Sequence, residues 1–457
     1  MIRRTVLVFV LIASLSQCTS RAARAADPQW KAGVAKVNIS PELPIWLSGY
    51  GARTKPAGSK HDELWGKALA IEDATGHRAV LVTLDVVGVP RDLSEKICTQ
   101  AEEKYKLPRS AIALNASHTH SGPVVRGNLM AMYSLDEDQS RRVTEYRTAL
   151  IDKVVKVIGD ALSSMQPAKL SWGVGQAGFA INRRNNKPEG QILQRIKDGN
   201  VVGPSDHELP ILAVHGEDGK LRAIVGGYAC HATVLDSYFI SADWPGAAQN
   251  ELERRHPGAL AMFVAGCGGD QNPLPRRSVA LMEKYGAQFA DGADAALKSL
   301  RPLPPTLKTV YEEIDLPFGT MPTRAELELA TKEPKPRDRW STYLLKQWDR
   351  DGSLPEKLPY PIQVWRLGDD LTWVLLGGEV VVDFSLRLKA EHGPKKMWVS
   401  AYSNDVMAYI PSRRVLAEGG YEGGEARYPY GLPAVWDASV EQKIIDASAK
   451  LITEAAK

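Results

Sequence analysis

The feature that most constrains this fold is an alternation of short apolar runs with longer amphipathic runs. Ala79–Val87 (AVLVTLDVV) has the pattern of a buried strand, and Asp92–Lys106 has the spacing of an amphipathic helix. The same patterns predict strands at Ser110–Ala116, Leu221–Ala229, Ala259–Ala265 and Leu371–Leu376, and helices at Val143–Met165, Val279–Leu300 and Val440–Ala456. Such alternation is typical of α/β proteins, so we expect mixed β-sheets flanked by helices.

The chain is long enough for several domains, but its pattern keeps one character throughout. It has 457 residues, of which 44% are hydrophobic and 24% charged, which is the balance of a globular protein. Arg301–Pro305 (RPLPP) could serve as a linker, yet the segment after it predicts strands of the same kind. We therefore expect one domain over residues 26–457, with long loops at Arg183–His207 and Ile410–Trp436.

The first 25 residues have the pattern of a secretory signal peptide. Two arginines precede the apolar run Val6–Leu15, which is too short to span a bilayer, and Ala23–Ala25 (ARA) is a cleavage site of the expected kind. This predicts a secreted or periplasmic protein. Two variants remain open, because the arginine pair could mark a twin-arginine signal and Cys18 could carry a lipid anchor, although the residue before it suits a lipobox poorly.

Net charge argues against a nucleic-acid partner, and the hydropathy of the chain after residue 25 argues against a membrane span. The formal net charge is +3, and four arginines within the first 25 residues account for it. The rest of the chain has no basic excess, so we expect no nucleic-acid partner, and no later run of about 18 apolar residues predicts a membrane span. Beyond the signal peptide the cysteines are Cys98, Cys230 and Cys267, which allows one disulfide with a free thiol or three buried thiols.

The strongest chemical signal is Ser117–Pro123 (SHTHSGP), directly after a predicted strand. In an extended chain, side chains two residues apart share a face, so His118 and His120 can point at one centre. Imidazole is a frequent zinc ligand, and this spacing is common in metal sites. The alternative is a pair of loop histidines with ordinary surface hydrogen bonds.

Three further signals also stand at the C-terminal ends of predicted strands. His231 follows Leu221–Ala229, where a buried structural histidine is the simpler interpretation of an isolated residue. Glu379 follows Leu371–Leu376 and two glycines, and its carboxylate could bind a ligand or cap a helix. The turn Gly266–Pro273 (GCGGDQNP) could bring backbone N–H groups to an anion, or be only a tight turn. Ligands bind at this edge of open α/β sheets, so the shared position strengthens each functional interpretation.

Taken together, these motifs resemble a known family. SHTHSGP, the His231 strand end, SADWPG, GGDQNP, GGE and the pair AYIPS and GYEGG occur in this order between about Trp30 and Trp436. This ordered set resembles the catalytic N-terminal domain of the neutral/alkaline non-lysosomal ceramidases. Members of that family are zinc-dependent amidases that hydrolyse the N-acyl bond of ceramide. The resemblance therefore implies a Zn²⁺ cofactor and a lipid amide or other small-molecule amide substrate.

The resemblance also implies roles for individual residues. The family's zinc ligands fall on His118, His231, Glu379 and Tyr409, and they leave one position open for water. The groups that face the reacting carbonyl and stabilise its developing negative charge fall on His120, Arg183 and Tyr421. Asp85 and Asp243 are candidates to orient metal-bound histidines, or they could be ordinary turn residues.

The sequence departs from the family pattern where the nucleophile is expected. Asn272 stands at the position of the family's serine, and an amide is neither a nucleophile nor a base at neutral pH. Either metal-activated water attacks alone, or Asn272 only positions the substrate, or the reaction differs. Cys267 could act as the nucleophile only if its pKa were lowered.

Two other departures concern the substrate. The family's C-terminal immunoglobulin-like domain has no counterpart after Val440–Ala456, which makes a membrane-embedded substrate less expected. Ile410–Trp436 could rim the site for a sugar or an anionic group, or it could pack on the protein itself. The charged and aromatic residues of that loop are Arg413, Arg414, Arg427, Tyr428, Tyr430 and Trp436.

The leading hypothesis is a secreted zinc-dependent hydrolase that cleaves an N-acyl bond with metal-activated water. One alternative keeps the zinc site but acts on an ester or an acylated sugar. Another is a non-catalytic zinc-binding protein that has lost the nucleophile. The sequence does not predict the oligomeric state.

Overall fold

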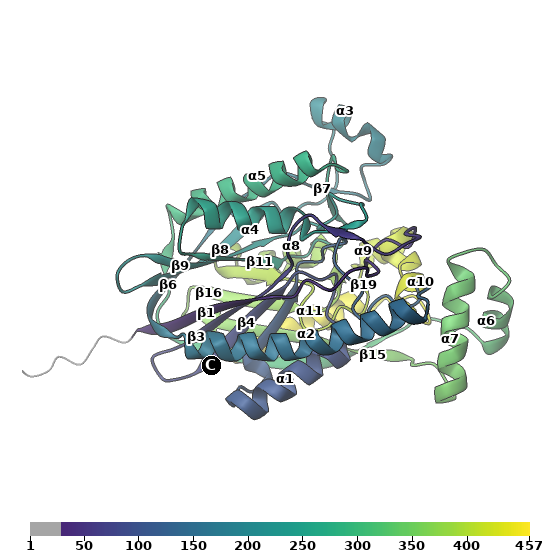
Figure 1. Cartoon of the computed structure of the whole chain (residues 1–457), viewed down its shortest axis with the longest axis horizontal. Coiled ribbons are helices and arrows are strands. Elements are labelled where there is room, and N and C mark those ends of the chain that lie inside the picture. The colour runs from purple at the N-terminus through teal and green to yellow at the C-terminus, as the bar shows by residue number, and fades with distance from the viewer. Residues whose placement is uncertain (1–28) are drawn as a thin grey trace, which may run out of the picture.

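The computed structural model describes residues 29–457, and the expected signal peptide with Cys18 lies outside them. Two β-sheets pack face to face, and helices cover their outer faces (Figure 1). Mixed sheets flanked by helices were expected from the sequence, and this prediction is confirmed. None of the helices in this part of the chain has the length and apolar character needed to cross a membrane.

The larger sheet is mixed, with the strand order β11-β9-β8-β6-β1-β3-β4-β5 and β13 paired with β6. Its strands are β1 (Trp30–Asn38), β3 (Trp65–Glu72), β4 (Arg78–Leu84), β5 (Ile112–Ala116), β6 (Gln166–Gln176), β8 (Glu208–Gly216), β9 (Leu221–Tyr228), β11 (Leu260–Ala265) and β13 (Arg301–Pro302). Only the outermost pairs, β4 with β5 and β9 with β11, are parallel. The two strand ends that carry the predicted histidines, β5 and β9, therefore lie toward opposite edges of this sheet.

The smaller sheet and three short strand pairs complete the β-structure. The smaller sheet has the order β14-β15-β16-β18. Its strands are β14 (Leu307–Pro317), β15 (Lys357–Leu367), β16 (Leu371–Leu376) and β18 (Met397–Ser400). The short pairs are β2 (Ser59–Lys60) with β10 (Phe239–Ile240), β7 (Ala180–Asn182) with β12 (Gln271–Pro273), and β17 (Glu379–Val380) with β19 (Tyr409–Ile410). Two of these pairs carry predicted site residues.

The longer helices cover the outer faces of the two sheets. Those on the larger sheet are α2 (Glu137–Ser163), α4 (Asp243–Arg255) and α5 (Val279–Leu297), and α1 (Arg91–Tyr105) packs on α2. Those on the smaller sheet are α8 (Val382–His392) and α11 (Val440–Ala455). The remaining helices are α3 (Ile192–Lys197), α6 (Arg324–Ala330), α7 (Arg337–Asp351), α9 (Arg413–Glu418) and α10 (Arg427–Tyr430). Every strand and helix named from the sequence is present, with ends shifted by a few residues.

A core rich in tryptophan fills the space between the sheets. Trp30 and Trp172 of the larger sheet belong to the same buried cluster as Trp365, Trp373 and Trp398 of the smaller one. The rings of Trp373 and Trp398 stack with centroids 4.0 Å apart. Large aromatic side chains give such an interface much of its energy, because each buries a wide apolar area.

The two edges of the larger sheet lie close together, although the order of strand pairing places them at opposite ends. Alternating antiparallel steps between β4 and β9 give β5 and β9 opposite senses within the sheet. Each strand is rotated relative to the one before it in the same sense, and over eight strands this twist turns the edges toward each other. The Ala265 N–H at the end of β11 donates to Asn115 Oδ1 of β5 at 2.9 Å. The strand ends thus meet by twisting, and not as one parallel edge.

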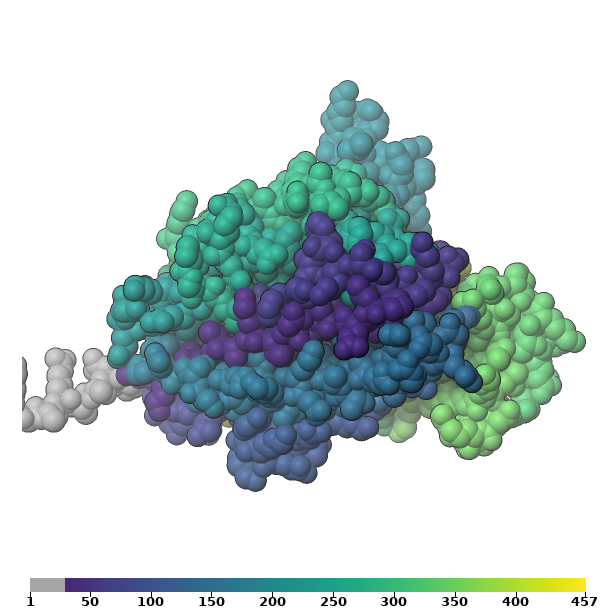
Figure 2. Space-filling model, viewed as in Figure 1, coloured from purple at the N-terminus to yellow at the C-terminus, as the bar shows by residue number. Residues whose placement is uncertain are grey.

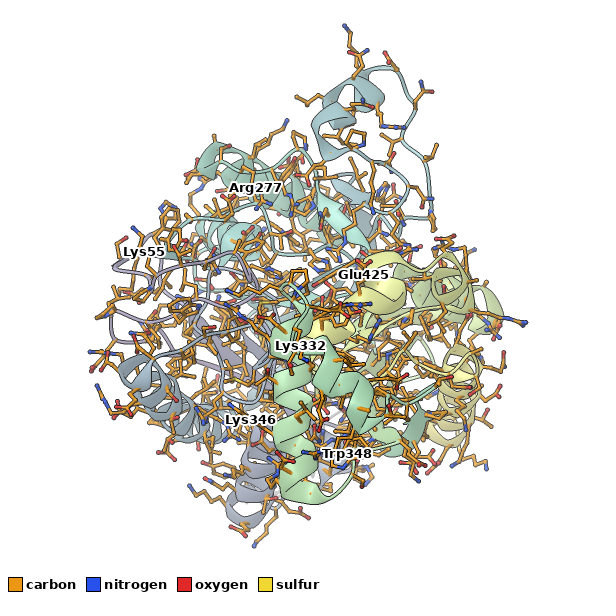
Figure 3. All side chains as sticks on the ribbon, turned by 90° about the vertical axis from the view of Figure 1, so that its right-hand side faces the viewer. Lys55, Arg277, Lys332, Lys346, Trp348 and Glu425 are labelled. Atoms are coloured by element: carbon orange, nitrogen blue, oxygen red, sulfur yellow. The ribbon has the colours of Figure 1, made fainter. Side chains whose placement is uncertain are left out.

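Two segments project from the packed sheets, as Figures 1 and 2 show. The α6–α7 hairpin has a small core of its own, which includes Leu327, Trp340 and Leu344 (Figure 3 shows this hairpin with Lys332, Lys346 and Trp348 labelled). The other projection carries α3 and lies within the predicted loop Arg183–His207. The other predicted loop, Ile410–Trp436, holds β19, α9, a π-helical turn at Tyr421–Glu425 and α10.

Contact between α5 and β6 yields a test of the packing. A Cβ atom on Gly175 would lie 2.1 Å from the carbonyl oxygen of Gly292, whereas a Cβ atom on Gly178 would meet nothing within 4 Å. We expect Gly175→Ala to lower the free energy of unfolding by about 1–3 kcal/mol, because α5 must move away from the strand. Gly178→Ala should change it by less than about 0.5 kcal/mol. Equal urea midpoints for the two variants would contradict this packing.

Candidate active site

Four polar side chains reach one point from the ends of separate strands. His118 follows β5 and His231 follows β9, while Glu379 and Tyr409 stand opposite each other in the parallel pair β17–β19. Gly378 allows this approach, because its φ is +74° and a Cβ atom there would lie 2.6 Å from Cγ1 of Ile410. The sequence GGE therefore delivers the carboxylate where a larger residue would block it.

Backbone carbonyl groups fix the tautomer of both inner histidines. Nδ1 of His118 lies 2.6 Å from the oxygen of Val87, and Nδ1 of His231 lies 2.6 Å from the oxygen of Gly268. A carbonyl oxygen can only accept, so each Nδ1 carries a proton, and in the neutral imidazole each Nε2 presents a lone pair. Burial and the charge of Arg183 lower the pKa of His231 to about 4, so its ring is neutral at pH 7.

The carboxylate of Glu379 faces the Nε2 atoms of both rings. Its Oε2 lies 3.0 Å from Nε2 of His118 and 3.2 Å from Nε2 of His231, and this buried oxygen has no hydrogen-bond donor in the described chain. Its Oε1 accepts a hydrogen bond from the Tyr430 hydroxyl at 2.5 Å.

This arrangement fits a bound cation. Three lone pairs that converge at hydrogen-bond distance repel one another unless a proton or a metal ion lies between them. Nitrogens of His118, His120 and His231 also lie within 4.8 Å of one another, which makes the three buried histidines a group that could hold a metal. Nitrogen and carboxylate oxygen donors of this kind suit zinc.

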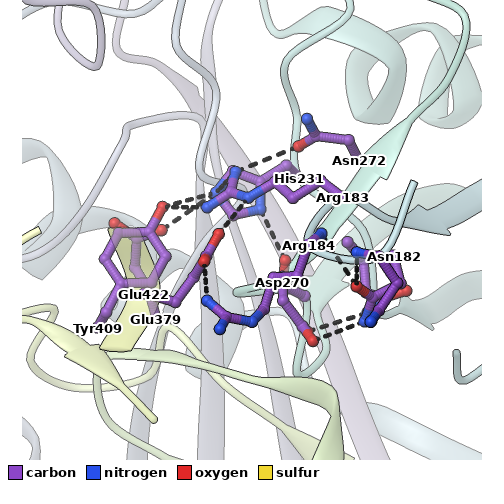
Figure 4. A network of polar contacts seen from close by, with 12 residues as sticks. Asn182, Arg183, Arg184, His231, Asp270, Asn272, Glu379, Tyr409 and Glu422 are labelled. Carbon is purple, nitrogen blue, oxygen red and sulfur yellow. Dashed lines mark hydrogen bonds and ion pairs between the residues drawn. The ribbon is translucent and has the colours of Figure 1, made fainter. Parts of the chain in front are cut away.

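Arg183 links this cluster to the remaining polar groups (Figure 4). Its Nη2 donates to the hydroxyl of Tyr409 at 3.0 Å, and its Nη1 lies 3.2 Å from Oδ1 of Asn272. Its Nε donates to Glu422 at 2.7 Å. Burial would raise the pKa of Glu422, but Arg183 lowers it to about 2, so the buried ion pair is fully charged.

The two turns that hold these residues are tied together by Asp270. The N–H of Arg183 donates to the main-chain oxygen of Asp270 at 2.9 Å, and the Asn182 amide donates to its carboxylate at 2.8 Å. The other carboxylate oxygen accepts from the N–H of Val382, at the start of α8, at 3.0 Å. The strand pair β7–β12 is thereby anchored to the helix that follows Glu379.

A cavity of about 380 Å³ opens beside the cluster. Five of the residues named from the sequence line it: His120, Arg183, Asn272, Tyr409 and Tyr421. Tyr421 is 39% exposed and lies at the surface end, while Tyr409 is buried. The structure thus brings all eight sequence-predicted site residues to one cavity and the polar cluster at its base.

Similarity to known proteins assigns the chain to a family. The profile described as "Neutral/alkaline non-lysosomal ceramidase, N-terminal" matches residues 30–272, more than half of the chain. This chain belongs to that family. The neutral ceramidase of Pseudomonas aeruginosa is 26% identical to it over 282 residues, which is 59% of this chain and 41% of that protein. The chain therefore spans less than half the length of that curated relative in sequence alignment.

Solved structures of similar fold cover nearly the whole chain. The crystal structure of the P. aeruginosa neutral ceramidase superposes with a TM-score of 0.70 at 21% identity, over 94% of this chain and 75% of that one. A structure titled "Ceramidase complexed with C2" superposes with a TM-score of 0.71 at 20% identity, with the same coverage. At this level of identity the superpositions establish a common fold.

Three roles that the sequence left open within this ceramidase-family site do not agree with the structure. Asp85 accepts from the N–H of Trp65, and Asp243 accepts from the N–H groups of residues 234, 235 and 244, so neither orients a histidine ring. The carbonyl groups described above take that role, because the segment after the neighbouring parallel strand, β4 for His118 and β11 for His231, passes beside each ring. Cys267 is not an activated nucleophile, since its thiol is buried and burial raises its pKa. All three cysteines in the described residues are free and buried.

The loop Ile410–Trp436 largely packs on the protein itself. Arg414 pairs with Asp383, and Arg427 and Tyr428 lie against Trp340 of α7. Trp436 donates to the main-chain oxygen of Tyr409 at 2.8 Å. The sequence did not predict that Tyr430 donates to Glu379. It also did not predict that Glu422 pairs with Arg183, although Glu422 belongs to the motif GYEGG. Their contacts depend on the path of the loop, which no local pattern predicts.

The histidine geometry predicts a specific loss of metal. We expect the purified protein to hold about one zinc ion per chain and the double variant H118A/H231A to hold almost none, because two of the converging donors are gone. Elemental analysis by mass spectrometry after gel filtration measures this. The control H61A/H77A removes two exposed histidines and should keep its zinc. Stoichiometric zinc in H118A/H231A would disprove the site.

Proposed function

We propose that this protein is a zinc-dependent amidase that hydrolyses the N-acyl bond of a lipid amide of the ceramide class. The observation that carries the proposal is that potential metal-ligand atoms of His118, His231 and Glu379 converge beside a cavity that also holds Arg183. We assign the metal to these three residues and Tyr409. The signal-peptide pattern of residues 1–25 further supports export of the chain.

When bound, zinc supplies Lewis-acid polarisation of the amide carbonyl and lowers the pKa of water. His118 and His231 would bind the metal through Nε2. Val87 and Gly268 accept from Nδ1 on the other side of each ring and so hold both rings in the orientation that this needs. Tyr430 donates to the outer oxygen of Glu379 and leaves the inner oxygen free for the metal.

We assign stabilisation of the developing oxyanion to His120, Arg183 and Tyr421. Arg183 keeps its positive charge, since Tyr409 and Glu422 raise its pKa well above the usual value despite burial. Burial lowers the pKa of His120 well below its usual value, so it offers a neutral imidazole to the cavity. Fixed donors in a site shielded from water stabilise negative charge more strongly than they do in water.

Asn272 has a positioning role in this scheme. Its side-chain oxygen lies 3.2 Å from Nη1 of Arg183, so it holds the guanidinium in the cavity and offers no nucleophilic atom. Asn272 thus supplies no nucleophile, and a bound zinc would supply the activation of an attacking water. A second candidate substrate is an ester or an acylated sugar, which the polar side chains of Asn186, Lys187 and Arg276 along the cavity favour.

Chelation provides the direct test of the proposed activity. We expect the purified protein to release fatty acid from a short-chain N-acyl-sphingosine, to lose this activity after dialysis against a chelator, and to regain it when zinc is restored. Chromatography of the released acid measures the rate. If zinc-loaded protein leaves the amide intact but cleaves an ester or an acylated sugar, the substrate assignment is wrong and the metal site stands.

Comparison of two substitutions tests the division of roles. We expect R183A to lower kcat by about 10²–10³-fold, because a charged donor to the oxyanion is lost. N272A should lower kcat by about tenfold or less, since it only loosens Arg183. The control R277A removes an arginine outside the catalytic cluster. An N272A variant as inactive as R183A, with full zinc content in both, would show that Asn272 takes part directly.

A further inference from the structure

The projection that carries α3 presents an unusual cluster of exposed apolar side chains. We call residues 187–203 the α3 finger. It carries four of the eight large apolar side chains that are exposed among residues 29–457. These four are Leu193 (64% exposed), Ile196 (44%), Val201 (39%) and Val202 (51%). Water-exposed side chains of this size, gathered on one projection, mark a surface that binds something apolar.

These side chains are not needed to fold the finger. Ile192 points inward and packs with Ile181 and Leu274. The buried amide of Asn186 clamps the two ends of the finger, because it donates to the oxygen of Val202 at 2.6 Å and accepts from its N–H at 3.1 Å. The finger is thus held by its base, and its apolar side chains at 193, 196, 201 and 202 remain free.

The finger begins at the catalytic cavity. Asn186, Lys187 and Glu189 line that cavity together with Arg183 and Tyr421. Figures 1 and 2 show the finger standing out from the body of the protein beyond β7, the strand that precedes Arg183. The base of the finger therefore forms part of the wall of the cavity.

The charges of the finger suit a lipid surface. Lys187, Arg195 and Lys197 are basic. Of the two acidic residues, Glu189 is neutralised by Arg276 at 2.6 Å, and Asp198 accepts from the amide of Gln194. Lys187 and Lys197 form no ion pair with any residue from 29 to 457. Apolar side chains interleaved with basic ones on a short helix are typical of segments that lie in the membrane interface and do not span the bilayer.

We propose that the α3 finger inserts its apolar side chains into the surface of a lipid bilayer and so places the cavity against membrane-held substrate. This proposal rests on the proposed function for the identity of the substrate, but not for the binding itself. A bilayer is favoured over a protein partner because the exposed groups are aliphatic and basic and lack the aromatic anchors typical of protein interfaces. Contact between two copies of this chain is the remaining alternative.

Vesicle flotation with the full mature protein tests the proposal. We expect the protein to bind mixed phosphatidylcholine and phosphatidylglycerol vesicles. The variant L193S/I196S should bind at least about tenfold more weakly, because two side chains that would enter the interface are replaced by polar ones. The control L329S/L386S removes two leucines of matching exposure, 65% and 37%, from α6 and α8, and it should bind as the unmodified protein does.

Three results would overturn the proposal. The unmodified protein could fail to bind vesicles, or the two double variants could bind equally well. Analytical ultracentrifugation could also show that L193S/I196S abolishes a dimer of a protein that ignores vesicles, which would assign the finger to contact between copies.

Kinetics separate this proposal from the proposed function. The rate on a long-chain amide embedded in vesicles, divided by the rate on a soluble short-chain amide, should fall at least about tenfold in L193S/I196S and stay constant in the control. Vesicle binding through the finger without hydrolysis of any amide would refute the proposed function alone. Hydrolysis of soluble amide with vesicle binding unaffected by L193S/I196S would refute the finger alone.

Discussion

The side chain of Asn115 joins the three strand ends on which the candidate site depends. Its Oδ1 accepts from the N–H of Ala265, and its Nδ2 donates to the oxygen of Ala401 at 2.7 Å and to the hydroxyl of Ser403 at 3.1 Å. One buried amide thus connects β5, β11 and the segment after β18. An amide is suited to this position because it supplies an acceptor and two donors without charge. This junction holds together the segments that lead on to His118, Asn272 and Tyr409.

Neutral backbone carbonyl groups, and not carboxylates, orient the histidines of the site. Val87 and Gly268 are carbonyl partners, so the imidazoles gain orientation without a second negative charge near Glu379. Among the other buried charges, Arg183 pairs with Glu422, whereas Asp270 is held by amide and main-chain N–H donors. Glu379 places its carboxylate where the ligand atoms meet, and no lysine or arginine of the described residues pairs with it.

Much of the fold, and the grouping of the candidate site residues, could be predicted from the sequence. Strand and helix periodicity is a local pattern, and the ordered motifs resemble those of a known family. Ala79–Val87 and Val279–Leu300 have clear periodicity, and SHTHSGP and GGE stand at strand ends. The meeting of the sheet edges could not be predicted, since twist accumulates over eight strands and leaves no local signal. The partners of the histidines were missed for a related reason: a backbone carbonyl has no sequence signature, whereas Asp85 and Asp243 looked chemically suitable.

The positions of the donors along the chain also set the order of events during folding. His118, His231, Glu379 and Tyr409 come from segments separated by long stretches, and they meet only after both sheets have formed and β17 has paired with β19. Small metal domains fold around their ion because the ligands are close in sequence. Here the proposed ion would enter a finished structure, so it could lock the strand ends together but could not nucleate them.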